Sequence, residues 1–329
     1  MLEKKEIKRI GVFTSGGDAP GMNAAIRAVV RTATYHDLQV YGIERGYEGM
    51  IQGKIKKLDT SEVGNIIHRG GTMLKTARSM EFMTSEGRLK AYNHLIRFEI
   101  DALVAIGGNG TFTGADIFSK EYNMPIIGVP GTIDNDLFGT DLTIGFDTAI
   151  NTAMEAADKI RDTADSHNRL FFVEVMGRHS GFIALHSAIG SGASGVLIPE
   201  SDSGYSDLLE VLESGTKRGK PFGLVIIAEG NKDGGAELVS KKLKKELGHY
   251  DTKVTIIGHM QRGGSPTCID RVLASRLGFE AVEALIAGRS NLMVGIYNNQ
   301  LSFTSFKDAI TNHKPVNQEL MRMAHILAM

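Results

Sequence analysis

A polar run, Pro130–Asp136, directly follows a short apolar stretch with the composition of a buried strand. Ligands of open α/β sheets bind at the carboxyl ends of the strands, so this run would lie at a ligand-binding edge. Asp134 and Asp136 are two positions apart, and in extended backbone their side chains would leave the chain on the same side. One carboxylate could take a proton from a substrate hydroxyl while the other helps to hold a metal ion. A polar turn is the alternative, because Gly, Asn and Asp also suit turns for backbone reasons.

Two glycine-rich segments also follow apolar runs. Thr14–Gly21 leads directly into a helical pattern, and Gly107–Thr111 follows a very apolar strand candidate. The free N–H groups and the dipole at the start of such a helix favour an anion such as phosphate. The first segment lacks the Gly-Lys-Ser/Thr ending of a P-loop, and the second has Thr113 where the third glycine of a dinucleotide fingerprint would stand. The alternative for the first segment is a tight connection with Asp18 as a helix cap.

Three arginines stand beside glycine or hydroxyl residues: Arg78, Arg178 and Arg262. Their planar guanidinium groups suit phosphate oxygens, although most arginines are surface ion-pair partners. Arg178 and Arg262 each follow an apolar run, which favours a ligand role. Glu229, at the end of the apolar run Leu224–Ala228, could accept hydrogen bonds from sugar hydroxyls. Together with the acid pair and the two loops, these residues predict phosphoryl transfer to a phosphorylated substrate that carries a hydroxyl, which needs charge neutralisation, alignment and a base.

The composition of the 329 residues excludes several other classes of protein. A net charge of −1 argues against bulk electrostatic capture of nucleic acid or of an anionic membrane. Cys268 is the single cysteine, so there is no intrachain disulfide and no thiolate metal cluster. No His-Glu-x-x-His pattern is present, which disfavours a zinc hydrolase. The sequence has neither a signal-peptide pattern nor an apolar stretch of membrane-spanning length, so we expect a cytoplasmic protein without nucleic-acid or membrane partners.

Short apolar runs alternate with helical patterns along most of the chain. This alternation predicts an α/β protein with largely parallel sheets that helices cover on both faces. The length suffices for two lobes. The predicted strands are Arg9–Thr14, Val40–Ile43, Ala102–Ile106, Pro125–Val129, Phe171–Val175, Val196–Ile198, Leu224–Ala228 and Val254–Ile257, and the predicted helices are one from Met22, Thr113–Glu121, Thr148–Thr163, Ser206–Lys217 and Ile269–Ala287.

In these motifs and their order, the chain resembles the bacterial ATP-dependent 6-phosphofructokinases. The resemblance implies two three-layer αβα domains: a nucleotide-binding lobe of residues 1–144 plus 261–312, and a sugar-phosphate-binding lobe of residues 145–260 plus 313–329. It implies Mg²⁺-assisted phosphorylation of fructose 6-phosphate by ATP to fructose 1,6-bisphosphate in glycolysis. It also implies an allosteric homotetramer with active sites shared between subunits. The matching segments are Thr14–Arg27, Arg69–Gly71, Arg78, Gly107–Thr111, Pro130–Asp136, Arg161–Thr163, Met176–Arg178, Gly258–Gly264 and Asp270–Arg276.

The resemblance also assigns roles to single residues. Asp134 would accept the proton of the sugar hydroxyl, Thr132 would place the transferring phosphoryl group, and Arg178 would join them in catalysis. The metal ion would be served by Asn109 and Asp136. The nucleotide would be bound by Gly17, Arg78, Ser79, Gly108, Asn109, Gly110 and Thr111. Fructose 6-phosphate would be bound by Thr132, Asp134, Arg169 (reaching into a neighbouring subunit), Met176, Gly177, Arg178, Glu229, Lys253, His259 and Arg262. An effector would be bound by Arg27, Arg31, Arg161, Arg218 and Lys220.

The phosphoryl donor also follows from the resemblance. Pyrophosphate-using relatives carry a lysine at the position of Gly131 and a second acid at the position of Gly110. Glycine at both positions leaves room for a nucleotide, so we expect ATP. Asn109 is a departure, because the family usually has an aspartate there that serves Mg²⁺. The alternative function is therefore a catalytically weakened sugar-phosphate-binding or regulatory paralogue.

Three further departures concern the sugar phosphate and the effector. Lys253 replaces an arginine, which keeps the charge but loses the bidentate fork. Asn65 and Ser194 stand where the family commonly has acids at the effector site, so we expect weak activation by magnesium-bound ADP.

A lipid or NAD kinase would share only the Gly-Gly-x-Gly-Thr type of loop. An oxidoreductase is disfavoured by the missing third glycine.

Overall fold

The structure is a computed structural model that describes residues 6–165, 169–202, 204–217, 223–246 and 251–328. The chain divides into two compact units. The first unit comprises residues 1–132, 137–145 and 262–314, and the second comprises residues 133–136, 146–261 and 315–329. The brief passage into the second unit at 133–136 was not predicted. Arg218 and Lys220, two of the expected effector residues, lie outside the described residues.

The sheet of the first unit is predominantly parallel. Its described strands are β1 (Arg9–Thr14), β2 (Gln39–Ile43), β3 (Ile55–Leu58), β4 (Ala102–Gly107), β5 (Ile126–Pro130), β10 (Leu292–Tyr297) and β11 (Gln300–Ser305). They lie in the order β11-β10-β5-β4-β1-β2-β3, and only the edge strands β3 and β11 pair in the antiparallel sense. The register places Val12 of β1 opposite Val104 of β4.

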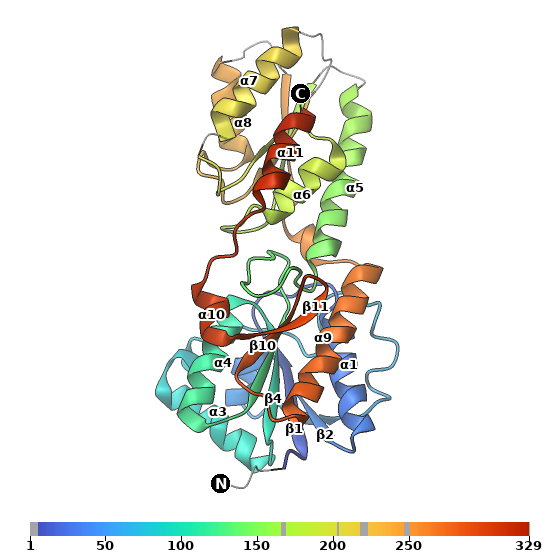
Figure 1. The fold of residues 1–329 in the computed structure, drawn as a ribbon, viewed down its shortest axis with the longest axis vertical. Coiled ribbons are helices and arrows are strands. Elements are labelled where there is room, and N and C mark those ends of the chain that lie inside the picture. Colours follow the sequence, from blue (N-terminus) through green and yellow to red (C-terminus); the bar gives the residue numbers. More distant parts are fainter. Residues whose placement is uncertain (1–5, 166–168, 203, 218–222, 247–250, 329) are drawn as a thin grey trace. The chain divides into compact units, whose positions relative to one another are not determined.

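Helices cover both faces of this sheet. They are α1 (Met22–Tyr35), α2 (Gly46–Ile51), η1 (Glu81–Met83), α3 (Ser85–Arg97), α4 (Asn109–Tyr122), α9 (Cys268–Ile286) and α10 (Phe306–Thr311). α1 packs along α9 on one face, whereas α3, α4 and α10 lie on the other (Figure 1). The first unit is therefore a three-layer αβα structure.

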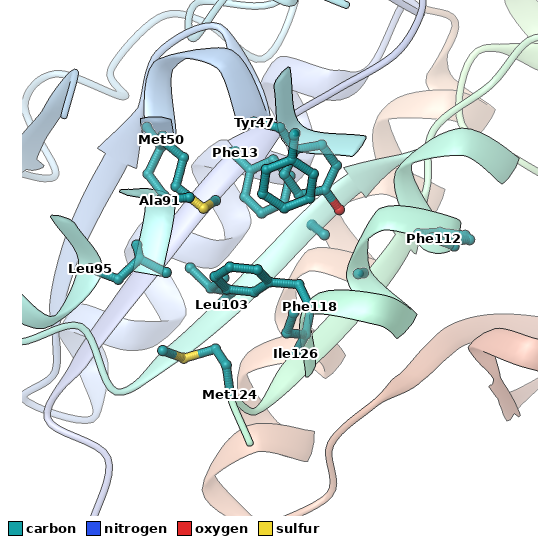
Figure 2. Close-up of a cluster of buried hydrophobic side chains, with 14 of the residues drawn as sticks. Phe13, Tyr47, Met50, Ala91, Leu95, Leu103, Phe112, Phe118, Met124 and Ile126 are labelled. Atoms are coloured by element: carbon teal, nitrogen blue, oxygen red, sulfur yellow. The ribbon is translucent and has the colours of Figure 1, made fainter. Parts of the chain in front are cut away.

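An aromatic cluster fills the space between the first sheet and the helices α3 and α4 (Figure 2). The ring of Tyr47 stacks on Phe82 at 4.0 Å between centroids and lies 4.9 Å from Phe13. Phe112 and Phe118 reach the cluster from α4 and are fully buried. Burial of each such ring contributes roughly 1.5–3 kcal/mol, so this core fixes the start of α4 against the sheet.

The second unit has a smaller sheet, and its described strands are all parallel. These strands are β6 (Arg169–Val175), β7 (Gly195–Leu197), β8 (Gly223–Ala228) and β9 (Asp251–Ile256), in the order β7-β8-β6-β9. α7 (Gly204–Lys217) and α8 (Ala236–Glu246) lie on one face, and α5 (Phe146–Asp165), α6 (Phe182–Ser191) and α11 (Gln318–Ala328) lie on the other (Figure 1). The short helix η2 (Gly258–Arg262) follows β9. The predicted αβα architecture with mostly parallel sheets is confirmed.

The predicted strands are all present with small shifts at their ends, but several elements were not predicted. β3 and β11 are antiparallel edge strands with mixed polar and apolar residues, and they lack the apolar runs that identified the buried strands. The prediction that a helix begins at Thr113 was wrong, because α4 begins at Asn109. Asn109, Gly110 and Thr111 therefore form the first turn of a helix instead of a loop.

Within the described residues, no helix combines the length and the hydropathy that crossing a membrane requires.

Candidate active site

Three polar loops follow the adjacent strands β1, β4 and β5 of the first unit, and the third loop passes into the second unit at residue 133. From β1 the chain continues to β2, toward one edge of the sheet, and from β4 it continues to β5, toward the opposite edge. The switch point, where ligands of α/β sheets bind, therefore lies between β1 and β4. Backbone hydrogen bonds continue beyond the strands, from Ser15 N to the Ile106 carbonyl at 3.0 Å and from Gly131 N to the Gly107 carbonyl at 2.9 Å. The sheet thus holds all three loops at one edge.

Thr111 joins two of these loops. Its buried hydroxyl donates to the Ser15 carbonyl at 3.1 Å, and its own carbonyl accepts from the Tyr47 hydroxyl at 2.6 Å. Burial raises the pKa of the Tyr47 phenol well above its ordinary value, so the phenol remains a donor. A Cβ at Gly107 would lie 2.2 Å from Thr111 Oγ1, so only glycine fits this approach. The start of α4 is therefore fixed both to the β1 loop and to the aromatic core.

The first turn of α4 begins without a side-chain cap. Its N-cap residue is Gly108, which has no side chain to cap the first N–H groups. A Cβ at Gly108 would lie 3.5 Å from the Cβ of Thr132, so Thr132 lies beside this turn. Gly110 is exposed, and a Cβ there would meet no atom within 4 Å. The structure thus brings together Gly108, Asn109, Gly110, Thr111 and Thr132.

The two donor-discriminating glycines have different surroundings. Gly110 faces open space, as the nucleotide argument requires. A Cβ at Gly131 would lie only 3.1 Å from both Ile106 Cγ2 and Met22 Cε. Gly131 is thus packed against Ile106 and Met22, and the room that it leaves for a nucleotide stays a prediction.

Arg262 lies in the first unit, against the β1 loop. Its Nη1 atom donates to the Asp18 carbonyl at 3.1 Å, and a Cβ at Gly17 would lie 2.6 Å from the same nitrogen. Within the first unit, Arg262 therefore lies beside Gly17. Asp18 is not the cap of α1, because the N-cap residue is Gly21, with φ of 109° and no side-chain cap.

The segment that carries Arg78 and Ser79 is held by a residue that the sequence analysis missed. Ser79 Oγ donates to Glu48 Oε2 at 2.7 Å and accepts from Phe82 N at 3.3 Å, while the Arg78 side chain is exposed. The Ser79 hydroxyl is therefore used to fix the segment. Glu48 lies 31 positions away in the sequence, and no motif in the sequence points to it.

The acid pair belongs to the second unit, whereas Thr132 belongs to the first. Asp134 is buried, at 4% exposed, and its carbonyl accepts from the Ser180 hydroxyl at 2.7 Å. Asn135 has φ of 52°, in the left-handed region. The backbone is thus not extended, and the same-side argument for Asp134 and Asp136 was wrong, because alternation of side chains requires extended backbone.

A group of sugar-phosphate candidates lies at the carboxyl ends of β6 and β8. Glu229 Oε1 accepts from Gly177 N at 3.3 Å and from Arg178 N at 2.8 Å. Met176 N donates to Gln261 Oε1 at 2.8 Å, and Gln261 is fully buried. The loop after β6 is thus fixed by side chains from two other segments. Gln261 was not identified from the sequence, where nothing separates it from a surface glutamine.

His259, Arg169 and Lys253 occupy different ends of this sheet. His259 is exposed on η2, directly after β9, at the carboxyl edge. Arg169 begins β6, roughly 20 Å along the strand from Met176. Arg169 Nε bonds Asp251 Oδ2 at 2.7 Å, and Lys253 Nζ lies 3.2 Å from Asp251 Oδ1. The pKa of Asp251 is lowered mainly by the hydrogen bond from Arg169 and, to a smaller extent, by the one from Lys253. Within one chain, Arg169 and Lys253 do not join the loop after β6.

The described effector candidates are distributed over both units. Arg27 and Arg31 lie one turn apart on α1, with Arg27 partly buried and Arg31 exposed. Arg161 on α5 donates to the carbonyls of Ser191 and Gly192 at the end of α6. Its guanidinium therefore also caps that helix.

Magnesium would have to be held largely by its substrate. The described residues contain no group of three or more His, Cys, Asp or Glu side chains that could hold a metal ion. Mg²⁺ usually keeps several waters and takes one or two protein ligands together with substrate phosphates. Asn109 and Asp136 offer one amide and one carboxylate.

Glycine-rich loops and a buried acid at the ends of parallel strands are the features expected of a phosphate-handling α/β protein. The family model described as "Phosphofructokinase" matches residues 9–285, and the chain belongs to this family. The ATP-dependent 6-phosphofructokinase of Cytophaga hutchinsonii is 54% identical over 321 residues, 98% of each chain. The ATP-dependent 6-phosphofructokinase 1 of Thermus thermophilus is 55% identical over 323 residues, 98% of this chain and 100% of its own.

Solved structures agree with this assignment. Phosphofructokinase from Saccharomyces cerevisiae matches 98% of this chain with a TM-score of 0.87 and 38% identity, and this chain covers 48% of the yeast chain. A pyrophosphate-dependent phosphofructokinase from Marinobacter aquaeolei matches with a TM-score of 0.82 at 24% identity, covering 95% of this chain and 86% of that one. The second likeness supports the fold alone.

Proposed function

We propose that this protein is an ATP-dependent 6-phosphofructokinase, which phosphorylates fructose 6-phosphate to fructose 1,6-bisphosphate in glycolysis. The observation that carries the proposal is identity of 54–55% over nearly the whole chain to relatives of that name. The open space beside Gly110 at the first turn of α4 adds support for a nucleotide as donor. The competing function, a catalytically weakened sugar-phosphate-binding or regulatory paralogue, rests only on Asn109.

The first unit would bind ATP and the second would bind the sugar phosphate. In the first unit, the N–H groups around Gly108 would face the phosphates, with the exposed Arg78 adding positive charge. In the second unit, the loop Met176–Arg178 and Glu229 would bind fructose 6-phosphate together with His259. Arg262 would contribute from its place beside the β1 loop.

In the reaction, the hydroxyl oxygen of the sugar would attack the γ-phosphorus of ATP, and Asp134 would accept the proton of that hydroxyl. The bond from that phosphorus to the bridging oxygen breaks, and ADP leaves with the electron pair. Thr132, beside Gly108, would align the phosphoryl group, and Arg178 would balance its charge. Asn109 and Asp136 would hold Mg²⁺, which supplies neutralisation of the phosphate charge.

The protein would act as a cytoplasmic homotetramer with active sites shared between subunits. Arg169 and Lys253 support this proposal, because they lie far along the sheet from the loop after β6 and form ion pairs with Asp251 near the start of β9. From there they would serve the sugar phosphate of a neighbouring subunit. An anionic effector would be bound by Arg27, Arg31 and Arg161, with weak activation by magnesium-bound ADP.

One assay tests the proposed function. Purified protein is given fructose 6-phosphate with either MgATP or magnesium pyrophosphate, and fructose 1,6-bisphosphate is measured. We expect turnover with ATP and none with pyrophosphate. Comparable rates with both donors would contradict the donor assignment. Binding of fructose 6-phosphate with little or no turnover by either donor would favour the catalytically weakened paralogue.

A further inference from the structure

A buried hydrogen bond links the candidate base to the candidate substrate loop. Ser180 Oγ donates to the backbone carbonyl of Asp134 at 2.7 Å, and both residues are 4% exposed. A buried carbonyl without a partner costs stability, so the native chain keeps such groups paired. The hydroxyl of Ser180 is thus committed to the peptide of Asp134.

The segment that carries Asp134 needs such a contact. It is irregular backbone between Thr132 and Leu137, both of which belong to the first unit, while residues 133–136 belong to the second. Asn135 has left-handed φ, so the backbone turns sharply directly after Asp134. Neither a helix nor a strand ladder includes the Asp134 peptide, and the Ser180 hydroxyl is a side-chain contact that holds it.

Ser180, by contrast, has a well-determined position. Its N–H donates to the Gly177 carbonyl at 2.9 Å, and the next N–H, of Gly181, donates to Glu200 Oε1 at 2.8 Å. A Cβ at Gly177 would lie 2.4 Å from the Ser180 carbonyl, so the turn tolerates only glycine there. The same loop is held at Arg178 N by Glu229. Ser180 is therefore the end of a loop that is anchored at several points.

We infer that Ser180 is a positioning residue, which sets the location of the Asp134 carboxylate relative to the loop Met176–Gly181. The inference rests on the proposed function, in which Asp134 is the base and this loop holds the sugar phosphate. Ser180 does no chemistry itself, because its hydroxyl proton is already shared with a carbonyl oxygen. Its effect would appear in the chemical step, where small displacements of a base lower the rate strongly.

The first test compares two buried serines of the same unit. Ser187 on α6 is fully buried, and its hydroxyl has no hydrogen-bond partner among the described residues. Ser180→Ala and Ser187→Ala thus delete the same group, but only the first breaks a bond. We expect Ser180→Ala to lower kcat about 3- to 10-fold, the value of one neutral hydrogen bond, with KM for fructose 6-phosphate little changed. Ser187→Ala should keep the kcat of the parent.

A double-mutant cycle distinguishes an effect on the position of the Asp134 carboxylate from a general loosening of the loop Met176–Gly181. If Ser180 acts through the carboxylate of Asp134, then Ser180→Ala should lower kcat in the parent but not in Asp134→Asn, where the base is already lost. A purely structural role would lower kcat by the same factor in both backgrounds and would raise KM for fructose 6-phosphate. Ser180→Cys keeps the size and a weak donor, and its kcat should fall between those of the parent and Ser180→Ala.

Each outcome of these kinetic measurements supports or overturns the positioning role of Ser180. An active parent whose kcat is matched by Ser180→Ala overturns the positioning role and leaves the proposed function intact. A parent without fructose 6-phosphate kinase activity overturns the proposed function, and this inference with it. Thermal unfolding of each variant checks folding. Should Ser180→Ala fail to fold, Ser180→Cys carries the test, and a kcat equal to that of the parent overturns the inference.

Discussion

The side-chain hydroxyl of Thr111 donates to the backbone carbonyl of Ser15 at 3.1 Å, across 96 positions of sequence. This bond joins the loop after β1 to the first turn of α4, on either side of the switch point of the first sheet. Thr111 is 2% exposed, so the bond is shielded from water. The two phosphate-type loops are therefore one rigid arrangement instead of two independent turns.

Thr111→Val should weaken ATP binding specifically. Valine keeps the shape but removes the donor, leaving the Ser15 carbonyl unpaired and the two loops unlinked. We expect KM for ATP to rise about 3- to 10-fold, with KM for fructose 6-phosphate little changed. Thr113→Val is the matched control, because the Thr113 hydroxyl is exposed and bonds only to the Asn109 carbonyl within its own helix. Equal effects of the two variants would contradict the role of this bond.

Gly110→Asp should impair the use of ATP without unfolding the protein. A Cβ added at Gly110 would meet no atom within 4 Å. A carboxylate in the first turn of α4 is also favoured by the helix dipole. The same carboxylate would repel the phosphates, so KM for MgATP should rise while the melting temperature is maintained. Gly110→Ala adds only a methyl group and should behave like the parent. Unchanged ATP kinetics in Gly110→Asp would show that the nucleotide lies elsewhere.

Asp134→Asn should abolish most turnover while fructose 6-phosphate still binds. An amide keeps the shape and the backbone bond to Ser180, but it cannot accept the hydroxyl proton as a base. General-base catalysis typically contributes about 10²–10⁴-fold, and we expect a loss of kcat in that range. Steady-state kinetics and equilibrium binding of fructose 6-phosphate measure the two effects separately. A kcat near that of the parent would exclude Asp134 as the base.

Asn109→Asp should tighten the requirement for magnesium and raise kcat. A carboxylate at this position adds an anionic oxygen of the kind that Mg²⁺ prefers. Magnesium titrations of both proteins at fixed ATP measure the change. A lower kcat with unchanged metal dependence would show that this chain has adapted to a neutral amide, because a new carboxylate near other acids adds repulsion.

Glu121→Gln should lower the stability of the first unit near neutral pH only. Arg88, which is buried, donates to Glu121 Oε2 at 2.6 Å and to Oε1 at 2.7 Å. This hydrogen bonding lowers the pKa of Glu121. Because the folded-state pKa is the lower one, the stabilisation is present above the unfolded pKa and is lost as pH falls through the folded value. Since Glu121 is a third exposed, we expect a loss of about 1 kcal/mol at pH 7.

Thermal unfolding of the parent and of Glu121→Gln from pH 7 to acid measures this effect, and the two melting temperatures should converge below about pH 4. Glu155→Gln is the control, because its ion pair with Lys159 is exposed and should contribute little at any pH. A difference between parent and Glu121→Gln that persists in acid would point to lost packing instead of lost charge.

The sequence by itself was sufficient to predict the buried strands and to identify the family. β4 and β8 are continuous apolar runs that end in glycine or in an acid, and each occurs as a fully buried strand followed by a polar loop. Apolar runs and helical periodicity report local burial, so they place Gly108 and Glu229 at strand ends. The resemblance to phosphofructokinases rests on motifs of adjacent residues, and the family match confirms it.

Only the tertiary structure decided which of these residues touch. The bonds from Ser79 to Glu48, from Ser180 to Asp134 and from Arg262 to Asp18 span 31, 46 and 244 positions. Side chains that meet over such separations do so because packed sheets and helices bring their elements together, and no periodicity in the sequence records that geometry. The left-handed backbone at Asn135 is a further example. Asparagine tolerates both extended and left-handed conformations, and the surrounding contacts select between them.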